Sequence, residues 1–189
     1  MSLDFMMDVE KCIEVLSAGG VILYPTDTVW GLGCDATNEA AVDKIMAIKE
    51  RPANKSFVVL VASERQVMQH AASVDLAVFD YLQSVNHPTT VIYEHALGIA
   101  ENALAADGSV AMRICNEEFC KHMIKRFRKP IISTSANISG APAAATFPEI
   151  SDVIKERVDY IVEYRRDDVS TKLPSAIIKW ENGNIIKLR

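Results

Sequence analysis

The stretch EEFCKHMIKRFRKPIISTSAN, residues 117–137, contains in one run the two patterns that decide the fold. In its first part, residues 117–128, apolar side chains recur at helical spacing and predict a helix. Pro130 is then followed by two isoleucines, which predict a buried strand. This strand leads directly into the polar run from Ser133 to Asn137. A helix, a buried strand and a polar loop in succession indicate an α/β fold in which a binding loop follows the strand.

Helix and strand patterns alternate loosely over the rest of the chain. The segment 26–36 is rich in hydroxyl groups and glycine and is expected to be a loop. Glu181-Asn182-Gly183 joins the last two strands and predicts an antiparallel hairpin, so the sheet should be mixed. We therefore expect one α/β domain over residues 1–189. The predicted helices are 8–18, 38–49, 64–71, 74–84, 117–128 and 149–156, and the predicted strands are 21–24, 57–61, 89–93, 110–114, a strand beginning at 130, 159–163, 175–180 and 184–188.

The composition is that of an ordinary globular protein. Of 189 residues, 49% are apolar and 24% are charged, and a chain of this length buries roughly 70% of its unfolded surface without needing disulfides or a metal. The net charge of −5 argues against a general nucleic-acid coat, although it leaves room for a local basic cleft.

The cysteine pattern and the lack of recognisable targeting signals together indicate a reducing compartment. The N-terminus carries Asp4 and Asp8 and has no apolar segment typical of a signal peptide. No apolar run approaches the ~20 residues of a membrane span. We therefore expect a cytoplasmic protein with no membrane partner. No Cys-x-x-Cys pair is present, and the neighbouring residues predict buried, reduced thiols at Cys12, Cys34, Cys115 and Cys120.

The first candidate for an anion site is Lys49-Glu50-Arg51, at the end of a predicted helix. With Lys55 it places three cations in seven residues, and lysine and arginine are the side chains that bind phosphate oxygens. Such residues are also stabilised at a helix C-terminus by ~0.3–1 kcal/mol without any function. Pro52 ends the helix at Arg51 and fixes the path of the arginine, which favours a site.

The second candidate is Ser135-Ala136-Asn137, directly after the strand that begins at Pro130. Serine and asparagine offer neutral hydrogen-bond donors, but they also form ordinary turns and helix caps. The residues alone leave function and structure equally open. If the fold brings this segment beside Lys49 and Arg51, the two together form a site for a polyanion such as a nucleoside triphosphate.

The loop after the first predicted strand is a third candidate. Thr26 and Thr28 can donate and accept hydrogen bonds, and Asp27 can hold a cation or an amine. Gly31 and Gly33 permit a close approach of the backbone. A turn with side-chain hydrogen bonds to its own backbone explains the same residues. The loop is not a Walker phosphate loop, because no Gly-Lys-Ser/Thr follows.

Charged residues elsewhere each have two explanations. Arg113 ends an apolar strand, so it must be paired or reach an edge, which suits either a carboxylate clamp or a structural ion pair. The basic residues within 121–129 could contact nucleic acid or form a solvated helix face. The four histidines show no metal-site spacing, so no metal site in the protein is predicted, and there is no supported Ser-His-Asp arrangement.

Four blocks of sequence, in this order, together resemble the YrdC-like family, in particular its L-threonylcarbamoyladenylate synthases of the TsaC type. The resemblance extends from about Ile13 to the C-terminus. The blocks are Tyr24-Pro25-Thr26-Asp27-Thr28-Val29-Trp30-Gly31-Leu32-Gly33, Lys49-x-Arg51-Pro52, Val110-Ala111-Met112-Arg113 and Ser133-Thr134-Ser135-Ala136-Asn137-Ile138-Ser139-Gly140.

The resemblance implies a fold and an activity. The fold is a twisted mixed sheet with flanking helices around a concave, positively lined cavity. The activity is that of a nucleotidyltransferase, which condenses L-threonine, bicarbonate and ATP to threonylcarbamoyl-adenylate and pyrophosphate for the threonylcarbamoyladenosine modification of tRNA. Mg²⁺ is implied as the companion of ATP. Downstream tRNA-modification proteins are implied as partners, as is tRNA or double-stranded RNA.

The resemblance also implies roles for individual residues. The implied catalytic residues are Lys49, Arg51, Ser135 and Asn137. The implied ATP-binding residues are Arg51, Lys55, Ser109, Ser135, Asn137 and Arg189. The implied L-threonine-binding residues are Thr28, Arg113, Ser133 and Ser175.

One segment departs from the family pattern, and two other functions remain open. Many members carry W-P-G-P where this chain has Val85-Asn86-His87-Pro88, which leaves the shape of one cavity wall open. The chain resembles the single-domain members. One alternative is a non-catalytic RNA- or nucleotide-binding YciO-like protein, but that branch departs at the Lys-x-Arg and Ser-x-Asn sets, which are intact here. The other is an unrelated nucleotide-dependent carbamoyl or phosphoryl transferase, which would not depend on threonine.

Overall fold

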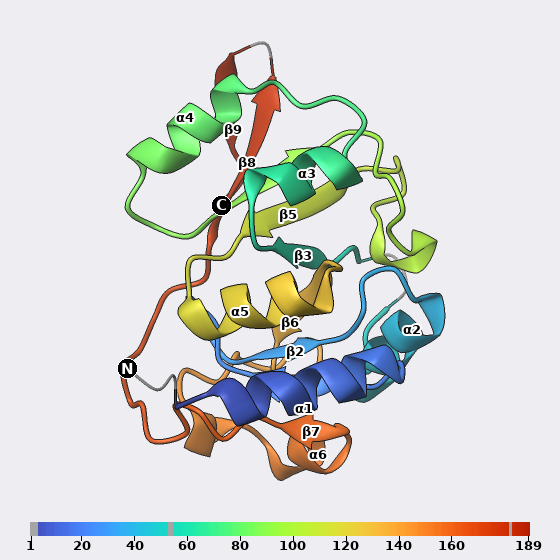
Figure 1. Ribbon diagram of the computed structural model, residues 1–189, viewed down its shortest axis with the longest axis vertical. Coiled ribbons are helices and arrows are strands. Elements are labelled where there is room, and N and C mark those ends of the chain that lie inside the picture. Colours follow the sequence, from blue (N-terminus) through green and yellow to red (C-terminus); the bar gives the residue numbers. More distant parts are fainter. Residues whose placement is uncertain (1–3, 53–54, 182) are drawn as a thin grey trace.

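A twisted sheet runs through the molecule, as the computed structural model shows over residues 4–52, 55–181 and 183–189 (Figure 1). Nine strands form it in the order β7-β1-β2-β6-β3-β5-β4-β8-β9. Their bounds are β1 Ile22–Tyr24, β2 Gly31–Gly33, β3 Val58–Val61, β4 Thr89–Tyr93, β5 Val110–Ile114, β6 Ile131–Ser135, β7 Tyr160–Ile161, β8 Ala176–Glu181 and β9 Asn184–Lys187.

The sheet is mixed, as the sequence predicts. The parallel pairs are β1 with β7, β3 with β5, and β4 with β8. The remaining neighbours are antiparallel, including β8 and β9, which form the expected hairpin. Gly183 in that turn has a φ of 77°, a conformation that glycine adopts without strain. Asn182 lies outside the described residues.

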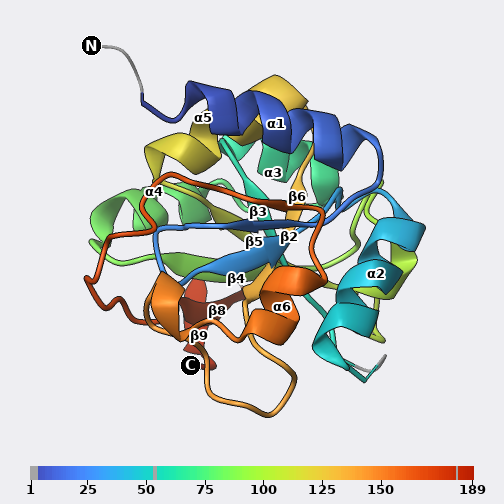
Figure 2. The same cartoon turned by 90° about the horizontal axis from the view of Figure 1, so that it is seen from below.

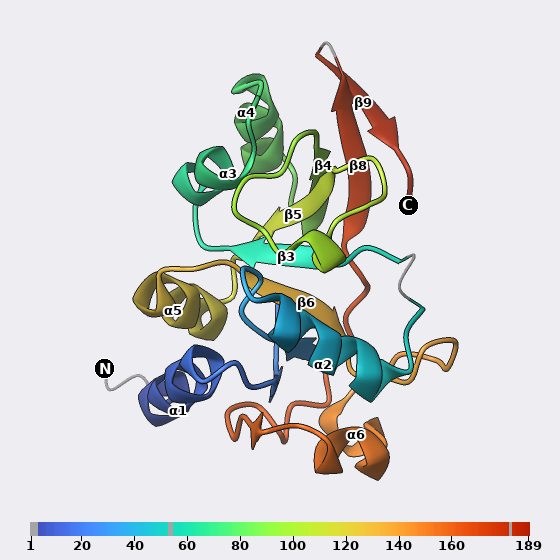
Figure 3. The same cartoon turned by 90° about the vertical axis from the view of Figure 1, so that its right-hand side faces the viewer.

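Four of the helices cover one face of the sheet. Figures 2 and 3 show α1, α3, α4 and α5 on this side, whereas α6 lies toward the other. The apolar side chains of α1 and α5 are buried at helical spacing and form the core with the strands. The helix bounds are α1 Met6–Ser17, α2 Glu39–Lys49, α3 Glu64–His70, α4 Ala77–Ser84, α5 Glu118–Phe127 and α6 Asp152–Glu156, with 3₁₀ turns η1 Glu101–Ala103 and η2 Phe147–Glu149.

Side-chain caps explain where several helices begin. Asn38 accepts a hydrogen bond from the backbone N–H of Ala41 at the start of α2, and Ser63 caps α3 in the same way. The carboxylate of Glu117 accepts from the N–H of Cys120 at the start of α5. These caps satisfy backbone donors that have no partner within a helix.

The expectation of a loop over residues 26–36 is wrong in part, because Gly31–Gly33 forms strand β2. This strand lies between β1 and β6 and pairs with both in antiparallel fashion. A Cβ atom on Gly33 would lie 2.7 Å from the ring of Tyr24 and 3.0 Å from the carbonyl oxygen of Ile132. Glycine is therefore required in a central strand that packs against an aromatic ring.

The four cysteines are free and buried, as predicted. No helix in the described part of the chain is long and apolar enough to cross a membrane.

Candidate active site

A cavity of about 520 Å³ lies where several polar segments meet. Its lining comes from the loop after β1, the residues after α2, strands β5 and β6, the loop after β6, the segment before β8 and the C-terminus. Figure 3 shows the segments after α2 and after β6, together with the C-terminus, on the side of the sheet away from α1 and α5. Among the described residues, three arginines and no aspartate or glutamate side chain line this cavity. The expected positively lined cavity is therefore present.

Arg51 reaches this cavity because of the way α2 ends. Glu50 has a left-handed backbone with a φ of 51°, and the N–H of Arg51 donates to the carbonyl of Met46. The guanidinium donates to the carbonyls of Lys55 and Ser56, at 3.3 and 2.6 Å. It also lies over the ring of Phe57, 4.5 Å from the ring centre. Burial lowers the pKa of Arg51 from its ordinary value, but arginine remains charged in proteins.

Lys49 has contacts different from those expected of a phosphate ligand. Its side chain is fully buried, and it is not among the lining residues of the cavity. Its Nζ donates to the carbonyls of Ser135 and Asn137, at 2.5 and 2.7 Å. The carbonyl of Lys49 accepts from the N–H of Ser139 at 2.7 Å. Lys49 therefore fastens the Ser-x-Asn loop to the end of α2.

Burial, together with the nearby charge of Arg51, lowers the pKa of Lys49 to about 8. The carbonyl oxygens around the ammonium group oppose this shift, because they favour the protonated form.

Ser135 and Asn137 present their side chains to the cavity from the end of β6. The Ser135 hydroxyl donates to Oδ1 of Asn137 at 2.5 Å. Nδ2 of Asn137 donates to the carbonyl of Ala141 at 2.6 Å, so both side chains are held in place within the loop. Together with Arg51 they form a cluster of polar groups in the lining of the cavity, which we call the phosphate side.

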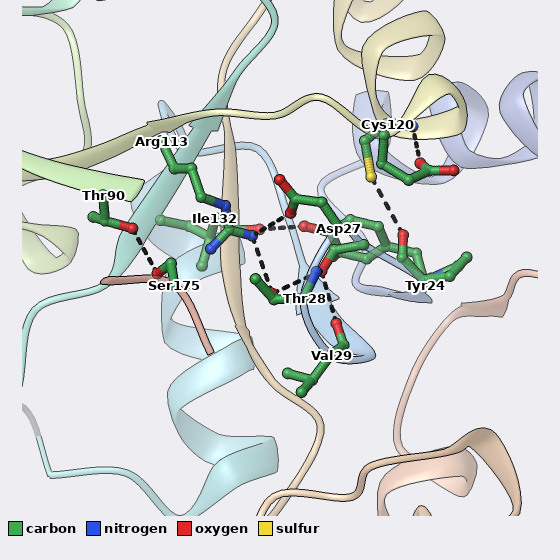
Figure 4. Close-up of polar contacts among 12 residues, drawn as sticks. Tyr24, Asp27, Thr28, Val29, Thr90, Arg113, Cys120, Ile132 and Ser175 are labelled. Atoms are coloured by element: carbon green, nitrogen blue, oxygen red, sulfur yellow. Dashed lines mark hydrogen bonds and ion pairs between the residues drawn. The ribbon is translucent and has the colours of Figure 1, made fainter. Parts of the chain in front are cut away.

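Arg113, another residue of the lining, extends from β5 toward the loop after β1 (Figure 4). Its Nη2 lies 3.0 Å from Oδ1 of Asp27 and 3.4 Å from the hydroxyl of Thr28. The Thr28 hydroxyl also lies 3.0 Å from that of Thr26, whose oxygen accepts from the Thr28 N–H. The buried arginine is thus held between two neighbouring residues of one loop. We call this the amino-acid side of the cavity, because a guanidinium with an adjacent hydroxyl matches a carboxylate.

Ser175 belongs to the same side and is buried. Its hydroxyl makes a 2.8 Å hydrogen bond with that of Thr90 on β4, a contact that Figure 4 shows close to Arg113. The carbonyl of Ser175 accepts from Nε and Nη2 of Arg189, at 3.2 and 3.0 Å. This fixes the C-terminal arginine at the cavity. Ser133, on β6, completes the set.

The fold thus brings together most of the residues that the sequence singled out. The residues that line the cavity are Thr28, Arg51, Arg113, Ser133, Ser135, Asn137, Ser175 and Arg189. Lys49, Lys55 and Ser109 do not line it. Lys55 is exposed and contributes its carbonyl to Arg51. Ser109 is buried just before β5, where its N–H donates to the carboxylate of Asp107.

Two features of the site are not apparent from the sequence. The sequence indicates that Asp27 can hold an amine, but no pattern pairs it with Arg113, which lies 86 positions further along the chain. Phe57, which supports Arg51, has the pattern of an ordinary strand residue. A buried arginine in an apolar strand does require an anionic partner, and that requirement was the available signal for Asp27.

The donor set suits a metal ion that arrives with a substrate. The described residues contain no group of three or more histidine, cysteine or carboxylate side chains that could hold a metal. The cavity offers neutral hydroxyl and amide oxygens from Thr28, Ser133, Ser135 and Asn137. Mg²⁺ keeps several waters and phosphate oxygens as ligands when it binds with a nucleotide, so these oxygens fit such a complex.

The fold and the cavity define an α/β protein with a site suited to small anionic molecules. The Sua5/YciO/YrdC family model, described as "Telomere recombination", matches residues 14–189, and the chain therefore belongs to this family. The threonylcarbamoyl-AMP synthase of Pseudoalteromonas translucida is 30% identical over 182 residues, which cover 95% of this chain and 96% of that protein.

Solved structures show the same fold. The crystal structure of P. abyssi Sua5 complexed with L-threonine matches 97% of this chain with a TM-score of 0.85 and 22% identity. The chain spans about half of that protein, 54% of its length. E. coli YciO matches 97% of this chain and 88% of its own, with a TM-score of 0.82 and 20% identity. At these identities the likeness concerns the fold.

Proposed function

We propose that this protein is an L-threonylcarbamoyladenylate synthase. It would condense L-threonine, bicarbonate and ATP to threonylcarbamoyl-adenylate and pyrophosphate, and the product would serve the threonylcarbamoyladenosine modification of tRNA. The observation that carries the proposal is that one cavity is lined both by Arg51 with Ser135 and Asn137 and by Arg113 with the adjacent hydroxyl of Thr28. Its volume of about 520 Å³ falls within the range of small-molecule sites, roughly 300–1,000 Å³.

On the phosphate side, Arg51 would bind the nucleotide as a planar, permanently charged donor. Ser135 and Asn137 would orient phosphate oxygens with neutral hydrogen bonds. Arg189 would contribute a further positive charge from the C-terminus. Lys49 would act from behind the loop by holding it in position, since its ammonium is directed at the loop carbonyls. Mg²⁺ would enter with ATP, held largely by phosphate and water.

On the amino-acid side, Arg113 would bind the carboxylate of threonine, with Thr28, Ser133 and Ser175 offering hydroxyl groups around it. The amine would take up bicarbonate or carbon dioxide to form a carbamate. A carbamate oxygen would then attack the α-phosphorus of ATP, and the bond to pyrophosphate would break. This second step needs little proton transfer from the protein, because phosphoryl and nucleotidyl transfer depend mainly on positioning and charge stabilisation.

The test is to incubate the purified protein with Mg²⁺, ATP, L-threonine and bicarbonate. Pyrophosphate is quantified, and the adenylate is identified by mass spectrometry. We expect pyrophosphate release that requires both threonine and bicarbonate. Pyrophosphate release without threonine would indicate another nucleotide-dependent transferase. Binding of RNA or nucleotide without turnover would indicate a binding protein of the YciO-like kind.

A further inference from the structure

The buried ion pair between Asp27 and Arg113 separates two cavities. Arg113 lines the candidate active site. Asp27 lines a second cavity, of about 850 Å³, beyond the carboxyl ends of the parallel strands β3 and β5. Their side chains are only 11% and 5% exposed. Asp27 thus lines the second cavity and is linked to the active site through its contact with Arg113.

The ion pair leaves polar atoms unsatisfied. Within the described part of the chain, Nε of Arg113 is buried and makes no hydrogen bond, and Oδ1 of Asp27 is buried with the ion pair to Nη2 of Arg113 but no hydrogen bond. Buried donors and acceptors nearly always have a partner, because leaving them unpaired is unfavourable. A ligand with a carboxylate for Arg113 and a protonated amine for Asp27 would satisfy both atoms, and an α-amino acid carries this combination.

The proposed reaction also releases a proton, which must have an acceptor. Threonine enters with an ammonium group, and the sum of the first step is R–NH₃⁺ + HCO₃⁻ → R–NH–COO⁻ + H₂O + H⁺. One proton must therefore leave for each carbamate formed. Among the described residues, no carboxylate or imidazole side chain lines the active-site cavity itself. Asp27, in contact with Arg113 at its wall, is the carboxylate placed to accept the proton.

We propose that Asp27 is the general base for the amino-acid substrate and that it delivers the proton to solvent in the second cavity. This inference rests on the function proposed above. When the threonine carboxylate takes up the guanidinium of Arg113, the ion pair with Asp27 is weakened. A carboxylate that loses its cationic partner is a better proton acceptor. The N–H bond of the ammonium breaks and an O–H bond forms on Asp27. The neutral amine then attacks the carbon of bicarbonate, and water leaves as the carbamate forms.

Several charged or titratable groups surround Asp27. Arg113 faces it from β5. The charged or titratable side chains that share its second cavity are Glu64 and Arg65 on α3, His87 before β4 and Lys121 on α5, and the buried thiol of Cys120 on α5 also interacts with its charge. Glu64 accepts a hydrogen bond from Gln83. Two cations, Arg65 and Lys121, and one carboxylate, Glu64, therefore share the second cavity with Asp27.

The deciding variant is Asp27→Asn, which keeps the size of the side chain but cannot accept the proton. We expect kcat to fall by about 10²–10⁴-fold, the usual contribution of a general base. The KM for threonine should change much less than kcat, because Arg113 still binds the substrate carboxylate and only the contact between Asp27 and the amine is lost. Glu64→Gln is the matched control: it makes the same chemical change in the same cavity and should leave the rate unchanged.

The pH dependence distinguishes a base from a structural residue. Without Asp27 only the neutral amine of threonine can react, and its fraction rises tenfold per pH unit below the amine pKa. The ratio of the Asp27→Asn rate to the wild-type rate should therefore rise about tenfold per unit between about pH 6 and 7.5. Changes in bicarbonate speciation cancel in this ratio. A structural defect would give a constant ratio.

If the Asp27→Asn variant does not fold, Asp27→Glu provides a second test of the same role. It retains an acceptor, so its pH profile should match that of the wild type even where its rate is lower. Two results would contradict the role of Asp27 while leaving the proposed function intact. One is a ratio of the Asp27→Glu rate to the wild-type rate that rises tenfold per pH unit. The other is an Asp27→Asn variant with the wild-type rate and a ratio that does not change with pH. Wild-type protein without threonine-dependent pyrophosphate release would overturn the proposed function, and this inference with it.

Discussion

Lys49 shows how a correctly selected residue can act in an unexpected way. The sequence indicates a phosphate ligand, because Lys49 is part of a cationic helix end. The structure buries its ammonium group against the carbonyls of Ser135 and Asn137. The charge still lies directly behind the donors of the phosphate side. Lys49 can therefore influence nucleotide binding through the position of the loop and through its charge, without lining the cavity.

The charge state of Lys49 makes nucleotide binding dependent on pH. Its pKa of about 8 lies below the ordinary value of about 10.4, so the buried ammonium is protonated only at lower pH. A bound polyanion favours the charged form and raises this pKa. We expect ATP binding at about pH 8.5 to take up protons, seen by calorimetry as a binding enthalpy that depends on the buffer.

The comparison variant for this measurement is Lys49→Met, in which the proton uptake should disappear. The phosphates of the nucleotide titrate near pH 6 and do not interfere. The same pKa shift affects stability: the unfolded chain binds more protons at this position between about pH 8 and 10, so the free energy of unfolding should rise with pH there. If ATP binding to Lys49→Met still takes up protons, another group is responsible for the proton uptake.

The affinity for ATP should depend on the shape of the Arg51 side chain as well as on its charge. Its fork donates to the carbonyls of Lys55 and Ser56 while its face packs on Phe57. Arg51→Ala should weaken ATP binding by about 1.5–3 kcal/mol, or 10- to 150-fold, because it removes charged hydrogen bonds. Arg51→Lys should recover only part of this, since a lysine lacks the planar fork. Equal affinity of Arg51→Lys and wild type, measured by calorimetry, would show that charge alone matters.

At the scale of elements, most helices and strands could be predicted from periodicity, whereas β2 could not. Its sequence, Gly31-Leu32-Gly33, has a single apolar side chain and is typical of a turn. What makes it a strand is its pairing with β1 and β6, which lie far apart in the sequence. Such pairing depends on tertiary context, and local propensity carries no information about it.

The glycines of β2 should differ in their tolerance of a methyl group. A Cβ on Gly33 would lie 2.7 Å from the Tyr24 ring, whereas on Gly31 its nearest neighbour is the carbonyl of Thr134 at 3.2 Å. Gly33→Ala should destabilise the protein by about 1–3 kcal/mol, the usual range for overpacking. Gly31→Ala is the matched comparison and should cost less. Denaturant unfolding measures both, and the reverse order would show that the Tyr24 ring moves aside easily.

At the scale of the whole molecule, the cavity depends on segments that are distant in the sequence. Thr28, Arg51, Arg113, Ser135 and Arg189 come from five separate parts of the chain. Each segment alone is equally compatible with a turn, a helix end or an ion pair. The order of the four blocks linked them to a family, but the exclusion of Lys55 and Ser109 from the cavity follows from strand register and loop path, which the sequence does not display.

Because the cavity joins segments from both ends of the sheet, a nucleotide bound in it should stabilise the entire fold. A ligand that binds only the native state at 100 times its dissociation constant stabilises that state by about 2.7 kcal/mol. For a domain of this size, this corresponds to a rise in Tm of about 5–10 °C. We expect this shift with Mg²⁺ and ATP in a thermal unfolding experiment. Arg51→Ala at the same ATP concentration should show a much smaller shift. A full shift in that variant would place the nucleotide in a different part of the molecule, and the second cavity beside Asp27 would then be the next to examine.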